Sequence, residues 1–203
     1  MKFMLKIIKN ILLSFCVLFS FSSWALENGA IAPDFSLMAA SGKLISLKEF
    51  KGKTVVLEWT NHGCPFVRKH YDSGNMQALQ IKYSQKGIIW LSIISSAEGK
   101  QGYVKPEEAL SDKKKFNSLA TDVLLDPKGV TGMMYEAKTT PHMFIINKEG
   151  KLVYQGAIDS INSTDSNDIK SAENYIEKAL DSILGNKPIK VAKTKSYGCS
   201  VKY

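Results

Sequence analysis

Hydrophobic residues lie in short runs that alternate with stretches of helical periodicity. Continuous apolar runs at residues 55–57 and 88–94 predict two strands buried on both faces, and a shorter run at 123–125 predicts a third. Apolar residues at helical spacing predict helices over 74–86 and 172–184, each followed by glycine. Strands and helices therefore alternate along the chain.

Three further signals complete this order. Pro106, followed by two glutamates, predicts another helix start. The runs 142–147 and 151–156 flank Glu149-Gly150 and predict a β-hairpin. The whole pattern predicts an α/β protein with a mixed central sheet and helices on both faces.

The first 25 residues have the organisation of a secretory signal peptide. A lysine-containing start precedes an apolar run over 11–21, and Ser23-Trp24-Ala25 offers small residues at the cleavage-determining positions. The run is shorter than the roughly 20 residues that span a bilayer. We therefore expect cleavage after Ala25, export to a periplasm, and no stable membrane span afterwards. Cys16 would leave with the signal.

Cleavage would leave 178 residues, divided into a domain over 26–185 and a basic tail over 186–203. The formal charge would fall from +8 to +5. Because the lysines are scattered and no basic stripe is interleaved with aromatics, we expect no nucleic-acid partner. Cys64 and Cys199 would remain, and two cysteines in an exported protein indicate one disulfide or a redox pair.

The stretch from Glu58 to His70 holds the main candidate chemistry. It predicts the end of a buried strand, a tight loop and a helix whose first residue is Pro65. Cys64 would then lie at or beside the N-cap, where free N–H groups and the helix dipole favour a thiolate. Arg68, one turn later, would add a cation, and His62 and His70 are further candidates.

From residue 29 onward the chain resembles a thioredoxin-superfamily redoxin, most closely the peroxiredoxin-like branch of the alkyl hydroperoxide reductase and thiol-specific antioxidant type. The matching pieces occur in the family's order and cover almost the whole mature chain. They are Ala32–Leu37, Leu47–Lys53, Cys64-Pro65, Thr140-Pro141 before a strand, and the hairpin Asn147–Lys151. The resemblance implies a thioredoxin-like fold and a thiol-based oxidoreductase that needs no cofactor.

The chain departs from the family's patterns in three ways. Thioredoxins carry a second cysteine three residues after the first, where this chain has Val67. Peroxiredoxins place proline and threonine seven and three residues before the peroxide-attacking cysteine, where this chain has Leu57 and Asn61. They also use a later arginine, but Arg68 is the only arginine here. The departures leave the oxidant open.

The resemblance also implies roles for residues around the active cysteine. Glu58 occupies the position of a buried acid that relays protons in thioredoxins, and burial would raise its pKa toward neutrality; alternatively it faces a polar edge. Thr140 and Pro141 would form a cis peptide opposite the cysteine, with His142 close by. The backbone before Pro141 would be free to pair with an extended substrate. Thr140, Pro141 and Trp59 are thus the expected substrate-binding residues.

The tail over 186–203 holds five lysines and no acid, without helical or strand periodicity. Such a segment is commonly a solvated arm. Tyr197, Val201 and Tyr203 are unusual for a disordered arm, however, and favour docking on the domain. Docking would bring Cys199 within reach of another cysteine.

Three hypotheses follow. In the first, Cys64 attacks a protein disulfide or a small peroxide and Cys199 resolves the product, within one chain or between the subunits of a dimer. In the second, His62, Cys64 and His142 converge on copper or zinc. In the third, a permanent Cys64–Cys199 disulfide pins the tail and contributes only stability.

Overall fold

A computed structural model of the chain describes residues 26–203. The predicted signal peptide over 1–25, including Cys16, lies outside the described residues. Among the helices of residues 26–203, none has the length and apolar character needed to cross a membrane.

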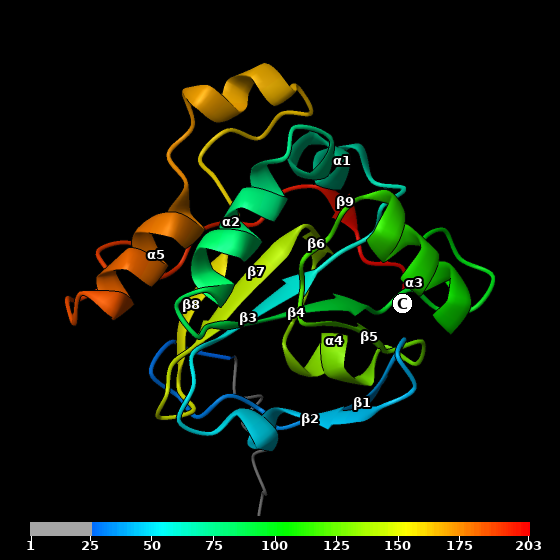
Figure 1. Ribbon diagram of the computed structural model, residues 1–203, viewed down its shortest axis with the longest axis horizontal. Coiled ribbons are helices and arrows are strands. Elements are labelled where there is room, and N and C mark those ends of the chain that lie inside the picture. Colours follow the sequence, from blue (N-terminus) through cyan, green and yellow to red (C-terminus); the bar gives the residue numbers. More distant parts are fainter. Residues whose placement is uncertain (1–25) are drawn as a thin grey trace, which may run out of the picture.

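The described part contains nine strands, five α-helices and two short 3₁₀ helices (Figure 1). The strands are β1 (Ser36–Ala39), β2 (Leu44–Ser46), β3 (Val55–Trp59), β4 (Ile89–Ile94), β5 (Asp122–Leu125), β6 (Thr139–Thr140), β7 (His142–Ile146), β8 (Leu152–Gly156) and β9 (Cys199–Ser200). The helices are α1 (Pro65–Asp72), α2 (Asn75–Ser84), α3 (Pro106–Lys115), α4 (Val130–Met134) and α5 (Tyr175–Leu184), with 3₁₀ turns at Leu47–Phe50 and Ser166–Lys170.

Seven strands form one mixed sheet in the order β2-β1-β5-β4-β3-β7-β8. The central pairs β3–β4 and β4–β5 are parallel, and the outer pairs are antiparallel. Figure 1 shows α1, α2 and α5 on one side of this sheet and α4 on the other. The predicted fold class, a mixed sheet with helices on both faces, is confirmed.

Alternation along β3 divides the core into two layers. Val56 faces the layer that holds α1, α2 and α5, where it joins a cluster containing Cys64. Val55, Leu57 and Trp59 face the opposite layer. All five residues of β3 are buried, as expected for a central strand covered on both faces. The loop that carries Cys64 therefore begins at the end of a strand in the middle of the fold.

Most predicted elements are present, but their ends differ. The last helix begins at Tyr175, not at residue 172, because the Asn174 side chain accepts a hydrogen bond from the Glu177 N–H and caps it there. Helix α4 was not predicted, since five residues are too few to display a helical period.

The tail docks on the domain, as predicted, and its last residue, Tyr203, lies against Gly129 and Gly132 at helix α4. On the edge strand β8, the Gln155 N–H donates to the Ala192 carbonyl, and the Gln155 carbonyl accepts from the Thr194 N–H. Further on, β9 pairs antiparallel with β6, and the Tyr203 hydroxyl donates to the Ala137 carbonyl at 2.6 Å. The 186–203 segment is therefore a strap across the domain.

Candidate functional site

Cys64 is the N-cap of α1, and Pro65 is the first helical residue, as the sequence predicts. The preceding loop is fixed by Asn61, whose side-chain oxygen accepts from the Gly63 N–H at 2.9 Å and whose carbonyl accepts from the Cys64 N–H at 2.9 Å. Cys64 is fully buried among the side chains beneath α1. Its sulfur thus lies at the positive end of the helix dipole.

Cys199 lies directly against Cys64. Both are free thiols, and their Sγ atoms are 2.6 Å apart. The Cys199 N–H also points at the Cys64 sulfur, at 3.4 Å, and the Thr140 carbonyl oxygen lies 3.1 Å from it, where it accepts from the thiol form. The structure brings together two cysteines that are 135 positions apart in the chain.

The two thiols have opposite acidity. Burial raises the pKa of Cys64, but hydrogen bonds from the Cys199 thiol and from the Val67 and Cys199 backbone outweigh it, so the net pKa is lowered from its ordinary value. Burial and the adjacent Cys64 sulfur raise the pKa of Cys199 to about 11. Cys64 is therefore the thiol that ionises first, and the Cys199 thiol then donates a hydrogen bond to the Cys64 thiolate.

The residue before Pro141 is not free to pair with a substrate, contrary to expectation. The Thr140–Pro141 peptide is cis, as predicted. Thr140, however, is paired with Cys199 across β6 and β9, so the chain's own tail occupies this edge. Gly198 permits the close approach: its φ is +129°, and a Cβ there would overlap the Thr140 carbonyl oxygen.

Glu58 is completely buried, which rules out the alternative that it faces a polar edge. Its carboxylate accepts from Trp90 Nε1 at 2.8 Å, from the Tyr71 hydroxyl at 3.0 Å and from the Ser92 hydroxyl at 3.3 Å. Burial raises the pKa of Glu58, and these hydrogen bonds offset only part of that effect. Because Tyr71 is on α1, Glu58 is linked by one side chain to the helix that Cys64 begins.

The expected contact between Trp59 and a substrate is wrong. Trp59 is fully buried, its Nε1 donates to the Ser95 hydroxyl at 3.0 Å, and its ring packs on Tyr135 and Phe144. Successive strand residues point to opposite faces, so Trp59 lies on the face away from Cys64.

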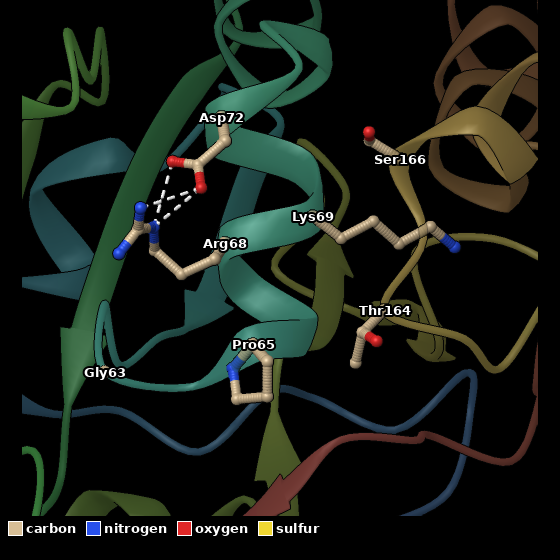
Figure 2. A pocket seen from close by; sticks show the side chains of 7 residues that line it. All are labelled: Gly63, Pro65, Arg68, Lys69, Asp72, Thr164 and Ser166. Carbon is tan, nitrogen blue, oxygen red and sulfur yellow. Dashed lines mark hydrogen bonds and ion pairs between the residues drawn. The ribbon is translucent and has the colours of Figure 1, made fainter.

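Arg68 is engaged by a neighbour other than Cys64. Its guanidinium forms an ion pair with Asp72 at 2.8 Å and lies 5.1 Å from the centre of the Phe116 ring. An open pocket of about 450 Å³ adjoins this pair beside the cysteine joint, with Lys69 reaching toward the loop of Thr164 (Figure 2). Its lining residues are Gly63, Pro65, Arg68, Lys69, Asp72, Thr164 and Ser166.

His62 and His70 supply no charge to Cys64 near neutral pH. His62 is stacked on Phe116, with ring centroids 4.3 Å apart, and burial lowers its pKa to about 4. His70 is fully buried, and burial likewise lowers its pKa to about 4. Both imidazoles are neutral at pH 7.

The predicted convergence of His62, Cys64 and His142 on a metal is also wrong. His142 packs on Phe144 on the Trp59 side of the sheet, and its Nδ1 accepts from the Lys138 N–H at 3.2 Å. The ring of His62 lies on the α1 side. Within residues 26–203 no three His, Cys, Asp or Glu side chains are grouped as metal ligands.

Sequence reasoning missed the residues that hold the tail near Cys64. Tyr197 hydrogen-bonds to Asp159, and Asp159 pairs with Lys69 of α1 at 3.2 Å. The sequence marks Tyr197 only as an aromatic residue that favours docking. No local pattern connects it with Asp159, because the two come together only when the tail folds back.

The sheet order, the N-cap cysteine and the facing Thr140–Pro141 peptide define a thioredoxin-superfamily oxidoreductase. The Redoxin family model matches residues 27–176, and the chain belongs to that family. The narrower peroxiredoxin-like resemblance stays a prediction.

Known relatives agree with this class. The chain is 30% identical over 125 residues to the thioredoxin-like protein YneN of Bacillus subtilis, covering 62% of this chain and 68% of that protein. It is 28% identical over 130 residues to the thiol-disulfide oxidoreductase ResA of Bacillus cereus, covering 64% and 69%. A crystal structure of an uncharacterized conserved protein from Geobacillus kaustophilus matches with a TM-score of 0.76 at 24% identity, covering 88% and 93%, and shares the fold.

Proposed function

We propose that the chain is an exported thiol-disulfide oxidoreductase in which Cys64 is the nucleophile and Cys199 the resolving cysteine. The observation that carries the proposal is the 2.6 Å separation of the two sulfurs at the start of α1. The lowered pKa of Cys64 and the raised pKa of Cys199 support this division of labour. The thiol-disulfide oxidoreductases among the relatives support the reaction class.

The reaction comprises two exchanges. The Cys64 thiolate attacks one sulfur of a partner disulfide, which forms a Cys64–partner bond and releases the partner's other sulfur as a thiolate. Cys199 then attacks Cys64 Sγ, forms the Cys64–Cys199 bond and releases the second partner sulfur. The partner is reduced by two electrons and the chain is oxidised by two, while the proton lost by Cys199 balances one taken up by the partner. The reverse sequence oxidises a dithiol.

We propose a polypeptide as the partner of this site. The edge beside Pro141 already accommodates an extended segment, β9, in antiparallel pairing with β6. A polypeptide disulfide would take the same pairing after β9 has left, with its sulfur in the place of Cys199. The buried carboxyl of Glu58, with its raised pKa, would exchange protons in this layer of the core.

The competing hypothesis is a permanent structural disulfide, and redox cycling separates the two. Protein equilibrated in glutathione buffers of graded potential is alkylated and its cysteine peptides are mapped by mass spectrometry. We expect the Cys64–Cys199 bond to form and break within the range of physiological thiol buffers. A bond that persists under strongly reducing conditions would support the permanent structural disulfide instead. A non-reducing gel distinguishes a bond within one chain from one between two copies.

Export is part of the proposal, and its support is the sequence pattern of residues 1–25. An oxidising compartment would allow two cysteines in contact to be used as a redox pair. N-terminal sequencing of the protein purified from its native host tests the cleavage site. We expect the mature chain to begin at Leu26, and an intact Met1 on a retained protein would contradict export.

A further inference from the structure

Beside the cysteine pair lies a buried charged cluster that the exchange reaction does not use. Asp159 and the side chain of Lys69 are both buried, with Lys69 Nζ 3.2 Å from Asp159 Oδ2 and 3.0 Å from the Ile161 carbonyl oxygen. The other carboxylate oxygen of Asp159 accepts a hydrogen bond from the Tyr197 hydroxyl. His70 Nε2 lies 3.8 Å from the same carboxylate. The cluster therefore joins the tail to α1 and to the loop after β8.

Tyr197 links this cluster directly to the redox pair. It precedes Cys199 by two residues, and its ring lies 5.9 Å from that of Phe66 and 5.8 Å from Lys69 Nζ. Phe66 and Lys69 are both on α1, the helix that Cys64 begins. The same helix thus carries the nucleophile and holds the segment that presents its partner.

We propose that Tyr197 and Asp159 form a latch that holds β9 over Cys64 and sets how often the edge of β6 opens to a polypeptide partner. This inference rests on the proposed function. Tyr197 is a positioning residue, since it acts through the placement of Cys199. A hydrogen bond to a buried carboxylate is among the stronger side-chain bonds, because a charged acceptor in a low-dielectric site attracts the donor strongly. Removing it should shift the opening equilibrium of β9 without touching either sulfur.

The test changes the phenol and leaves the buried ion pair in place. Replacing Asp159 or Lys69 would leave an unpaired buried charge and would endanger the fold. Tyr197→Phe removes a single oxygen and retains the ring against Phe66. Tyr175→Phe is the matched control: Tyr175 lines the same 290 Å³ cavity as Tyr197, but among the described residues its hydroxyl makes no hydrogen bond to Asp159.

Hydrogen exchange of the reduced full chain measures the opening of β9. The Val201 N–H donates to the Lys138 carbonyl at 3.0 Å, so its exchange reports the strap's release. We expect exchange over 197–201 to be about tenfold faster in Tyr197→Phe than in the wild type, the effect of losing a hydrogen bond to a charged group. Exchange in Tyr175→Phe should match the wild type. Equal exchange in Tyr197→Phe and the wild type would overturn the latch.

Reaction with insulin, a polypeptide disulfide, supplies the second readout. If β9 must leave before a polypeptide reaches Cys64, Tyr197→Phe should attack insulin about tenfold faster, in proportion to the opening constant. Tyr175→Phe should react at the wild-type rate, and an equal gain in both variants would refute the latch. If the wild type reacts and Tyr197→Phe is no faster, the latch is refuted while the proposed function stands. If the wild type does not react at Cys64 at all, the proposed function fails. The latch is then tested by hydrogen exchange alone.

Discussion

The two cysteines belong to regions of opposite construction. Cys64 follows β3, which is paired on both sides by β4 and β7, and it begins a helix whose first residues are fixed by the fold. Cys199 lies in a two-residue strand near the end of the strap, where it pairs only with β6. Cys64 is fully buried, whereas Cys199 is only partly buried.

Under the proposed function, this difference would suit the two roles, a nucleophile at a helix start and a resolving cysteine on a separate segment. The fixed region contributes the Val67 N–H of α1 to the lowered pKa of Cys64, while the thiol and backbone of Cys199 supply the other hydrogen bonds. A resolving cysteine has to leave and return, so it is better placed on a segment that can open locally. The two regions should therefore respond differently to substitution.

The largest effect is expected from Gly198→Ala, which should displace the strap from the edge of β6. The φ of +129° is unfavourable for alanine, and its Cβ would overlap the Thr140 carbonyl oxygen. We expect the equilibrium constant for the Cys64–Cys199 disulfide to fall about a hundredfold, since backbone strain of this kind costs on the order of 1–3 kcal/mol before the overlap is counted. Quantitative peptide mapping in glutathione buffers measures it.

Gly150→Ala is the control for this variant. Gly150 also has a positive φ, +77°, but a Cβ there would contact nothing within 4 Å. It should affect the stability of the hairpin and leave the disulfide equilibrium unchanged. Equal effects of the two substitutions on that equilibrium would mean that the strap is not held by its fit against Thr140.

The next largest expected effect is a difference in reactivity between the Cys64 and Cys199 thiols. Because the pKa of Cys199 is raised to about 11 and that of Cys64 is lowered from its ordinary value, the thiolate fraction of Cys64 at pH 8 should exceed that of Cys199 by more than about a hundredfold. Brief alkylation of the reduced protein with iodoacetamide across pH, followed by mass spectrometry, reports both sites. An apparent pKa of Cys64 at or above that of an ordinary thiol would remove its assignment as the nucleophile.

The smallest effect is expected from His62→Phe, which should change only the stability of the region around Cys64. The pKa of His62 is about 4 in the folded chain and about 6.5 unfolded, so the unfolded state binds an extra proton and stability is lost as pH falls from 6.5 toward 4. Phenylalanine retains the stack on Phe116 and removes this loss, about 2 kcal/mol at pH 5.

Denaturant unfolding at pH 7 and pH 5 measures the difference. His70 and His142 also have lowered pKa values, so the variant should retain part of the acid sensitivity. The Cys64 alkylation profile should be unchanged, because a neutral His62 supplies no charge. An unaltered loss of stability between the two pH values would contradict the assignment for His62.

The region from β3 to the start of α1 could be predicted from the sequence because its signals are local. The apolar run of β3 and the Cys64-Pro65 joint each fall within a few residues and locate the strand and the helix start. The prediction for Trp59 is wrong because neighbouring residues of a strand face opposite layers of the core. Trp59 therefore lies on the side of the sheet away from Cys64.

The strap could be predicted only in part. Its aromatic residues favour docking, which the structure confirms, but the pairing of Thr140 with Cys199 joins two-residue strands across 59 positions. Such short strands carry no period of their own. Asp159 and Lys69 likewise have no sequence signal, because their pairing depends on tertiary packing alone.

Trapping of the mixed disulfide distinguishes the attacking cysteine, Cys64, from the resolving cysteine, Cys199. Reduced Cys199→Ser and Cys64→Ser proteins are mixed with insulin, quenched in acid and mapped by mass spectrometry. We predict that Cys199→Ser accumulates a mixed disulfide on Cys64, while Cys64→Ser forms none above background and has lost thiol-disulfide exchange. A mixed disulfide on Cys199 in Cys64→Ser, or full activity of that variant, would contradict the account.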